Sequence, residues 1–173
     1  MAEVKDAENT LLIEIDTGRG GGEVVVEMLA EVAPKHVEQI KALVRAGDYD
    51  NVVFHRVIEG FMAQTGDVEH GDAEDGFDIR RCGTGASGRA NVPAEFSKIP
   101  FDRGAVGMAR SQNPNSGNSQ FFIMVADGHF LNGQYTVWGR VVSGMDHVDA
   151  IPRGEPPAQP GRMRSLRIAG DGA

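Results

Sequence analysis

The chain has 173 residues, of which 40% are hydrophobic and 24% are charged, as is usual for one soluble globular domain. Its 17 Lys and Arg against 25 Asp and Glu give a net charge of −8, which argues against a protein that binds the phosphate backbone of a nucleic acid. No segment has the length of a signal-peptide core or a membrane span, so we expect a cytoplasmic protein without membrane contact.

The chain begins with a polar segment, residues 1–9, which we predict to be a flexible tail ahead of a single domain at 10–169. Two runs rich in β-branched residues, 10–15 and 23–29, predict the first two strands. The glycines at 16–22 supply the reversal between them, so the fold opens as a meander.

An amphipathic helix follows these strands. It should begin at Pro34, which the first helical turn tolerates, and end at Gly47. Its apolar positions fall at helical spacing and should pack on the sheet: Val37, Ile40, Leu43 and Val44. His36 on this helix and His147 near a second one are expected at the surface.

The stretch from Phe54 to Asp67, FHRVIEGFMAQTGD, combines groups that seldom occur together. It places Arg56 on the first of two predicted strands, 52–57 and 61–64, and close in sequence to the large apolar side chains of Phe61 and Met62. An arginine in such surroundings needs a fixed partner for its donors. The stretch therefore predicts either a concave functional surface or a hairpin that holds a buried, paired arginine.

A long polar segment at 67–93 is expected to be a loop, which in a compact domain is functional or mobile. Gly83 to Gly88 matches a dinucleotide-binding pattern, but no helix can follow it into Pro93. The acidic residues at 72–78 lack the spacing of a calcium-binding loop, so a solvated charge run is favoured over a metal site.

Cys82 in this loop is the chain's single cysteine, so no intrachain disulfide can form, which agrees with a reducing compartment. The cations of Arg80 and Arg81 precede it and would favour its thiolate. We weigh a reactive thiol against an inert loop cysteine.

The second half of the chain predicts the strands 104–110, 119–125, 136–142 and 163–168, with a short helix between the last two. In 119–125 a period of two puts Phe121 on one face and Gln120 and Phe122 on the other. Arginines at 162–167 fit the solvent face of the last strand. The eight strands and two helices predict a mainly β fold, an eight-stranded antiparallel closed β-barrel capped by two α-helices.

The usual catalytic sets are scarce. The five histidines have no zinc-ligand spacing, and no nucleophile elbow of the G-x-S-x-G type occurs. A hydrolase triad built in space on His55 remains an alternative that no motif supports.

Three motifs occur in order: the stretch around Arg56, then Gly107 to Ile123, then Phe130 to Gly139. Together they resemble the cyclophilin peptidyl-prolyl cis–trans isomerases from about Thr10 to Ile168. The resemblance implies an eight-stranded barrel with a helix at each end, and the isomerisation of Xaa-Pro bonds in proteins and peptides. It implies no cofactor and no metal.

The resemblance also implies the site residues. Arg56, Phe61 and Gln64 are the catalytic set, and the substrate-binding residues are His55, Met62, Ala109, Arg110, Gln120, Phe122, Phe130, Leu131 and Tyr135. Phe130, Tyr135 and Arg110 stand where well-known eukaryotic members carry tryptophan, histidine and asparagine, choices similar to bacterial members. We therefore expect only weak cyclosporin binding.

The implied partners are proline-containing peptides and unfolded proteins, bound by a monomer whose activity assists protein folding. A different class of function stays open, a module or chaperone that holds proline-containing segments with incidental turnover. A ligand-carrying barrel of lipocalin type is disfavoured, because alternating strands at this length need a filled interior.

Overall fold

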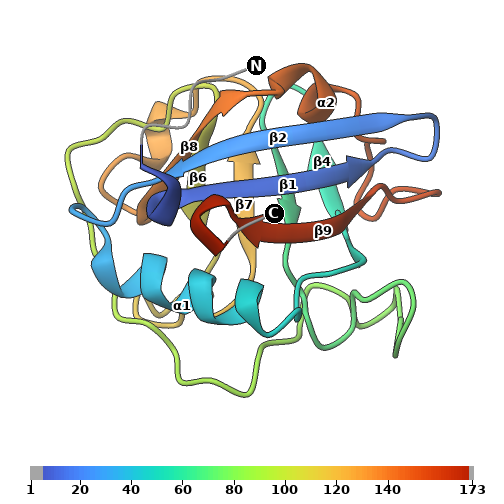
Figure 1. Cartoon of the computed structure of the whole chain (residues 1–173), viewed down its shortest axis with the longest axis horizontal. Coiled ribbons are helices and arrows are strands. Elements are labelled where there is room, and N and C mark those ends of the chain that lie inside the picture. Colours follow the sequence, from blue (N-terminus) through green and yellow to red (C-terminus); the bar gives the residue numbers. More distant parts are fainter. Residues whose placement is uncertain (1–5, 172–173) are drawn as a thin grey trace.

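A computed structural model describes residues 6–171 as a curled antiparallel sheet with two α-helices (Figure 1). The strand order is β3-β9-β1-β2-β8-β6-β7-β5-β4. The strands are β1 (Thr10–Asp16), β2 (Gly21–Met28), β3 (Val52–Val53), β4 (Arg56–Ile58), β5 (Met62–Thr65), β6 (Ala105–Met108), β7 (Phe121–Met124), β8 (Val137–Ser143) and β9 (Arg162–Ile168). The helices are α1 (Pro34–Arg45) and α2 (Met145–Asp149), with 3-10 turns at Ala7–Asn9, His129–Leu131 and Ala169–Asp171. The predicted mainly β, antiparallel fold with two α-helices is confirmed, with a curled sheet that ends at β3 and β4 in place of the predicted closed barrel.

The predicted count of eight strands is wrong by one, because the predicted strand at 52–57 is divided into β3 and β4. β3 pairs with β9 at one end of the sheet, and β4 pairs with β5 at the other. Phe54 and His55, which lie between β3 and β4, therefore carry the chain from one sheet edge to the other. Phe54 is fully buried there and donates its N–H to the carbonyl of Gly161 at 2.8 Å.

Alternation along β7 divides the core into two parts, as its period of two predicts. Phe121 and Ile123 belong to the main core, which also takes the buried face of α1. Phe122 and Met124 point the other way, into a second apolar cluster with Phe101. This second cluster lies beneath the candidate site.

Helix α1 begins at Pro34 as predicted, and Gly47 follows its end with a positive φ of 76°. His36, expected at the surface, is instead 1% exposed. Its backbone N–H and its Nδ1 both contact Oε1 of Glu95, at 2.8 and 2.6 Å. The helix start is thus satisfied by a carboxylate from a distant loop, a partner that helical spacing does not reveal. His147, the other histidine expected at the surface, is half-buried, and its ring lies against Gly22.

The end of the predicted flexible tail is structured where it is described. Residues 1–5 lie outside the described range, and Ala7–Asn9 form a 3-10 turn next to Ala169–Asp171. The guanidinium of Arg45 joins the two turns, at 2.9 Å from Glu8 and 3.0 Å from Asp171.

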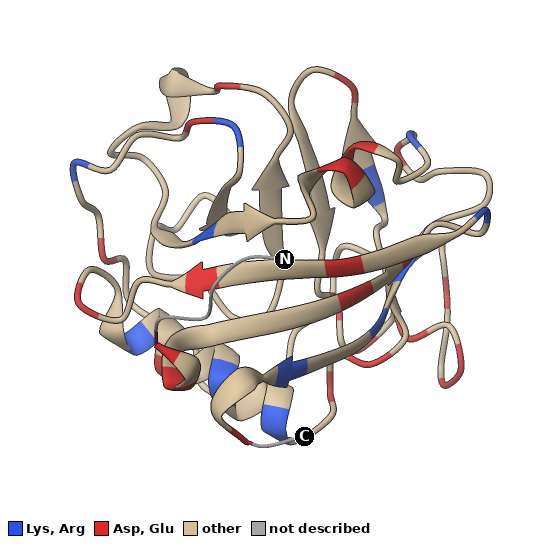
Figure 2. Ribbon diagram, turned by 45° about the horizontal axis from the view of Figure 1, so that its top comes forward, with Lys and Arg blue, Asp and Glu red and all other residues tan. Residues whose placement is uncertain are grey.

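Charged residues follow the pattern expected of a solvent-exposed surface. Figure 2 shows Lys and Arg on α1 and β9, while Asp and Glu are spread over strands and loops. The β9 arginines pair with carboxylates, Arg164 with Asp16 at 2.8 Å and Arg162 with Glu74 at 2.7 Å. From residue 6 to residue 171 no helix is long and apolar enough to cross a membrane.

Candidate active groove

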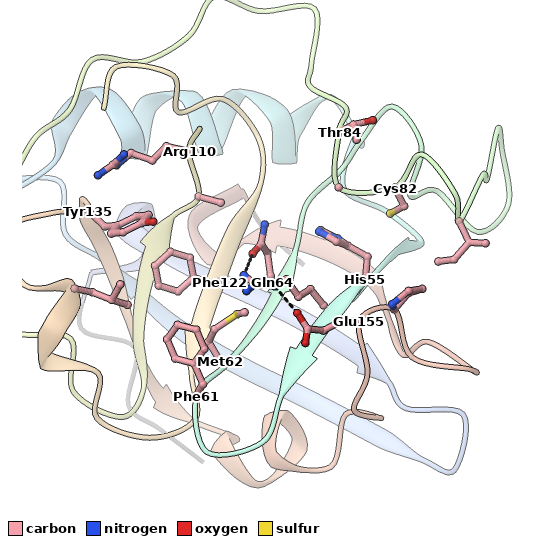
Figure 3. A pocket seen from close by; sticks show the side chains of 16 residues that line it. His55, Phe61, Met62, Gln64, Cys82, Thr84, Arg110, Phe122, Tyr135 and Glu155 are labelled. Carbon is pink, nitrogen blue, oxygen red and sulfur yellow. Dashed lines mark hydrogen bonds and ion pairs between the residues drawn. The ribbon is translucent and has the colours of Figure 1, made fainter. Parts of the chain in front are cut away.

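A pocket of about 470 Å³ opens where β4, β5 and β7 meet four loops (Figure 3). All the predicted site residues line it except Gln120 and Phe130. Its lining residues are His55, Arg56, Phe61, Met62, Gln64, Ile79, Cys82, Gly83, Thr84, Ala109, Arg110, Phe122, Leu131, Tyr135, Glu155 and Pro156. Gln120 lines an adjoining pocket of about 360 Å³ that shares Gln64, Ala109 and Arg110.

The apolar side of the pocket is built on the second core cluster. Met62, Phe122 and Leu131 are all buried and belong to that cluster, and Phe61 packs against it. Phe101 stacks on Phe122 from within, with ring centroids 5.7 Å apart. A close-packed interior resists deformation, so this wall can hold a small apolar ring in one place.

Phe130 marks the outer edge of this apolar wall. Its side chain is 72% exposed, and its ring centroid lies 5.5 Å from that of Phe61. The structure therefore places Phe130 beside Phe61, outside the residues that line the pocket.

The polar side of the pocket is a chain of side-chain hydrogen bonds. Arg56 on β4 lies opposite Gln64 on β5 in the antiparallel register, and its Nη1 is 3.5 Å from Oε1 of Gln64. Gln64 donates from Nε2 to Oε1 of Gln120 at 3.1 Å. Gln120 in turn donates to the carbonyl of Gly85 at 3.0 Å. Each amide is therefore oriented by the next.

Arg56 is paired but not buried, so the alternative of a buried, paired arginine is only half right. Its Nε donates to Oε1 of Glu155 at 3.0 Å, and its side chain is 43% exposed. Among the described residues Nη2 makes no hydrogen bond. The guanidinium therefore retains donors that can reach a ligand in the pocket.

His55 lies between β3 and β4 and is only 7% exposed. Burial lowers the pKa of its imidazole, the carboxylate of Asp67 opposes this shift, and the cation of Arg56 adds to it. Its Nδ1 has no hydrogen-bond partner among the described residues. No hydrogen bond joins His55 to a serine in the part of the chain that the structure describes, so the geometry gives no support to a hydrolase triad.

Arg110 covers the end of the pocket opposite Glu155. Its guanidinium carbon lies 4.4 Å from the centre of the Tyr135 ring, and Nη2 donates to the carbonyl of Gln134 at 2.7 Å. The Ala109 N–H donates to the carbonyl of Gln120 at 3.0 Å, so that amide is committed to the sheet. The main chain of Arg110 is the neighbouring group that can still contact a bound peptide.

The long loop at 67–93 forms a wall of the pocket that sequence reasoning missed. Asp67 is fully buried, and its two carboxylate oxygens accept N–H groups from both ends of the loop. The donors are Glu69 at 3.1 Å, His70 at 2.8 Å, Gly83 at 2.7 Å and Gly85 at 2.9 Å. This anchor places Ile79, Cys82, Gly83 and Thr84 on the pocket. The sequence shows Asp67 at the start of the loop and Gly83 and Gly85 near its end, but no pattern in it indicates that these residues are partners.

The thiol of Cys82 faces this pocket, yet it is not activated. Burial raises its pKa to about 12, and the nearby carboxylate of Asp67 acts in the same direction. The raised pKa favours the inert loop cysteine over the reactive thiol, because desolvation is the largest influence on this group.

The predicted acidic cluster at 72–78 is likewise not assembled into a metal site in the part of the chain that the structure describes. There, potential ligand atoms come together at Asp102, Asp127 and His129, within 4.8 Å of one another. All three residues are exposed, and His129 already contacts Asp102 at 2.6 Å. Asp72 instead accepts the N–H of Glu74 in a turn.

Comparisons with known proteins agree with this geometry. Residues 12–168 match the family profile described as cyclophilin type peptidyl-prolyl cis-trans isomerase/CLD. A probable peptidyl-prolyl cis-trans isomerase from Brucella suis biovar 1 is 61% identical over 153 residues, which are 88% of this chain and 76% of the relative. The peptidyl-prolyl cis-trans isomerase cyp18 from Streptomyces antibioticus is 37% identical, with 91% of this chain and 98% of the relative covered.

Solved structures show the same likeness. The cyclophilin AquaCyp293 from Hirschia baltica superposes with a TM-score of 0.83 and 29% identity over 97% of this chain and 76% of that one. A cyclophilin type isomerase from Cryptosporidium parvum, crystallised in the presence of the dipeptide Ala-Pro, gives a TM-score of 0.77 and 25% identity. That comparison covers 92% of this chain and 98% of the other.

Proposed function

The chain belongs to the cyclophilin-type peptidyl-prolyl cis–trans isomerases, and from this premise we propose that Arg56 is the residue through which it accelerates the rotation of Xaa-Pro bonds. Amide resonance sets a barrier of about 18–20 kcal/mol, so exchange without an enzyme takes roughly 10–100 s. An enzyme must bind the twisted amide more tightly than either planar form.

In the twisted state the prolyl nitrogen loses its resonance and regains a lone pair. Arg56 faces the apolar pocket with donors free, so one of its N–H groups can hydrogen-bond this nitrogen. The pocket of Phe61, Met62, Phe122 and Leu131 clamps the proline ring. Gln64 and the main chain of Arg110 hold the flanking peptide, while the carbonyl side rotates. No bond is made or broken, and no proton is transferred.

The observation that carries this proposal is the position of Arg56. Its guanidinium stands beside a wall of buried apolar residues and is held by the amide of Gln64 from the neighbouring strand. A fixed charge next to an apolar pocket is what the differential stabilisation of a polar transition state requires.

We further propose that the substrates are proline-containing peptides and unfolded proteins. The Ala-Pro dipeptide named with the Cryptosporidium parvum structure supports a site of this chemistry. The single cysteine agrees with work in the cytoplasm. Phe130 has no indole N–H to donate, which supports weak cyclosporin binding, and the described exposed apolar side chains come from separate segments, which supports a monomer.

The proposal is tested by cis-to-trans exchange of a short Xaa-Pro peptide with the wild type, Arg56→Ala and Arg56→Lys. We expect Arg56→Ala to lower kcat/KM by about 10²–10³, the loss typical of one preorganised donor. Arg56→Lys should also be poor, because an ammonium does not replace the planar fork. Arg153→Ala, an exposed arginine outside the pocket, is the matched control. Near-normal activity in both Arg56 variants would show that Arg56 lacks this role. If the wild type also fails to accelerate exchange, the remaining function is that of a module that binds proline-containing segments.

A further inference from the structure

Glu155 stands beside Arg56 although 99 residues separate them in the chain. The preceding residue, Gly154, exchanges two backbone hydrogen bonds with Val57, at 2.8 and 2.9 Å. Val57 directly follows Arg56 on β4, so this bridge fixes the two side chains next to each other. In Figure 3 the carboxylate of Glu155 lies at the pocket on the side of Gln64, with a dashed line that marks its interaction; Nε of Arg56 is the donor to this carboxylate.

The contact between these residues involves one edge of the guanidinium. Nε of Arg56 lies 3.0 Å from Oε1 of Glu155, whereas Nη1 lies 3.5 Å from Oε1 of Gln64. The shorter bond joins two charges and is the stronger constraint on the guanidinium plane. It uses the nitrogen that lies next to the aliphatic stem, and among the described residues Nη2 has no hydrogen-bond partner.

We propose that Glu155 is a positioning residue that orients Arg56 toward the rotating amide, an inference that rests on the role proposed for Arg56. A planar guanidinium donates well only in its own plane, so its setting decides whether its N–H groups reach the prolyl nitrogen. The carboxylate also compensates the cation when a bound peptide covers the pocket and removes water from it.

The size and kind of the effect follow from exposure. The Arg56 side chain is 43% exposed and that of Glu155 57%, so solvent weakens their pairing. We therefore expect Glu155→Ala to lower kcat about 2- to 5-fold, the effect of one exposed ion pair. KM should change little, because the interaction serves the twisted amide rather than the bound ground state. Glu155→Gln keeps an acceptor oxygen, so its kcat should lie between those of the wild type and Glu155→Ala.

A double-mutant cycle separates positioning from a structural role. Glu155→Ala is measured in the wild-type and in the Arg56→Ala background, with Glu59→Gln as a control that removes another exposed carboxylate, one that lies 3.8 Å from Arg153. A residue that acts through Arg56 loses its effect when Arg56 is absent. We expect Glu155→Ala to lower kcat in the wild-type background but not in the Arg56→Ala background, and Glu59→Gln to leave kcat unchanged.

A second measurement follows the guanidinium itself. The ¹H and ¹⁵N resonances of Arg56 Nε–H should shift in Glu155→Gln and Glu155→Ala and stay in place in Glu59→Gln. An unmoved Nε–H signal, an unchanged kcat in Glu155→Ala, or an equal loss in both backgrounds would overturn the role of Glu155. If Arg56→Ala keeps near-normal activity, the role proposed for Arg56 is wrong, and so is the role of Glu155 that depends on it. If Arg56→Ala is inactive but Glu155→Ala has normal kcat, only the role of Glu155 is wrong.

Discussion

Gln120 donates from its side-chain Nε2 to the main-chain carbonyl of Gly85 at 3.0 Å. This bond ties the residue before β7 to the loop at 67–93. Through Gln64 it continues to Arg56, so the loop that carries no recognisable motif takes part in holding the polar side of the groove.

Gln120→Ala should therefore weaken catalysis without touching the apolar pocket. It removes two neutral hydrogen bonds, the one from Gln64 and the one to Gly85, each worth about 0.5–1.5 kcal/mol, and of these the bond from Gln64 is the one that reaches Arg56. We expect kcat/KM to fall between about 2- and 10-fold, measured by peptide exchange. Gln112→Ala, an exposed residue of the next loop, is the control and should keep full activity. An unchanged kcat/KM in Gln120→Ala would show that the contact between this loop and Gln120 does not contribute to catalysis.

Asp67→Asn should loosen the loop wall. The amide replaces an acceptor oxygen by an NH₂ group that faces backbone N–H donors, and a buried donor left unsatisfied costs about 1–3 kcal/mol. We expect a loss of unfolding free energy of that size in urea denaturation. Amide hydrogen exchange should quicken at Gly83 and Gly85, which donate to one carboxylate oxygen. Protection equal to that of the wild type at these amides would contradict the anchor.

The sequence predicted the elements whose signals are local and periodic. Alternation in β7 correctly separated Phe121 from Phe122, and proline and glycine marked the ends of α1. It did not predict where β3 ends, because Val52 to Val57 is uniformly β-like, while the break at Phe54 arises because β3 pairs at one end of the sheet and β4 at the other.

Partners distant in the chain were beyond the reach of sequence patterns. The motif around Arg56 identified one side of the groove, since its groups lie close in sequence. Glu155 enters from 99 residues away, and Asp67 meets Gly85 across 18 residues without any periodic signal. The same limit applied to His36, whose burial depends on Glu95.

His55 should titrate at an unusually low pH. Burial lowers its pKa, while the hydrogen bond to the carboxylate of Asp102 raises the pKa of the exposed His129, which serves as an internal control. A lowered folded pKa means that the unfolded state binds more protons, so the His55 contribution makes stability fall as pH drops below about 6.5. NMR titration of both rings checks this. A His55 midpoint at or above that of His129 would contradict the burial argument.

Cys82 should be a slow thiol. With a pKa of about 12 it carries far less thiolate at pH 8 than a free cysteine, whose pKa is about 8.5. We expect alkylation by iodoacetamide at least about tenfold slower than that of a cysteine peptide, and full isomerase activity in Cys82→Ser. Alkylation of Cys82 faster than that of the cysteine peptide would contradict this prediction and favour a reactive thiol.

The most direct test of the central claim separates binding from rotation in one sample. Magnetisation-exchange NMR on an Xaa-Pro peptide gives the cis–trans rate on the protein, and chemical-shift titration of the same sample gives the affinity. We predict that Arg56→Ala binds the peptide within a few-fold of the wild type and loses nearly all exchange, because Arg56 acts on the twisted amide. Exchange near the wild-type rate in Arg56→Ala would contradict the account.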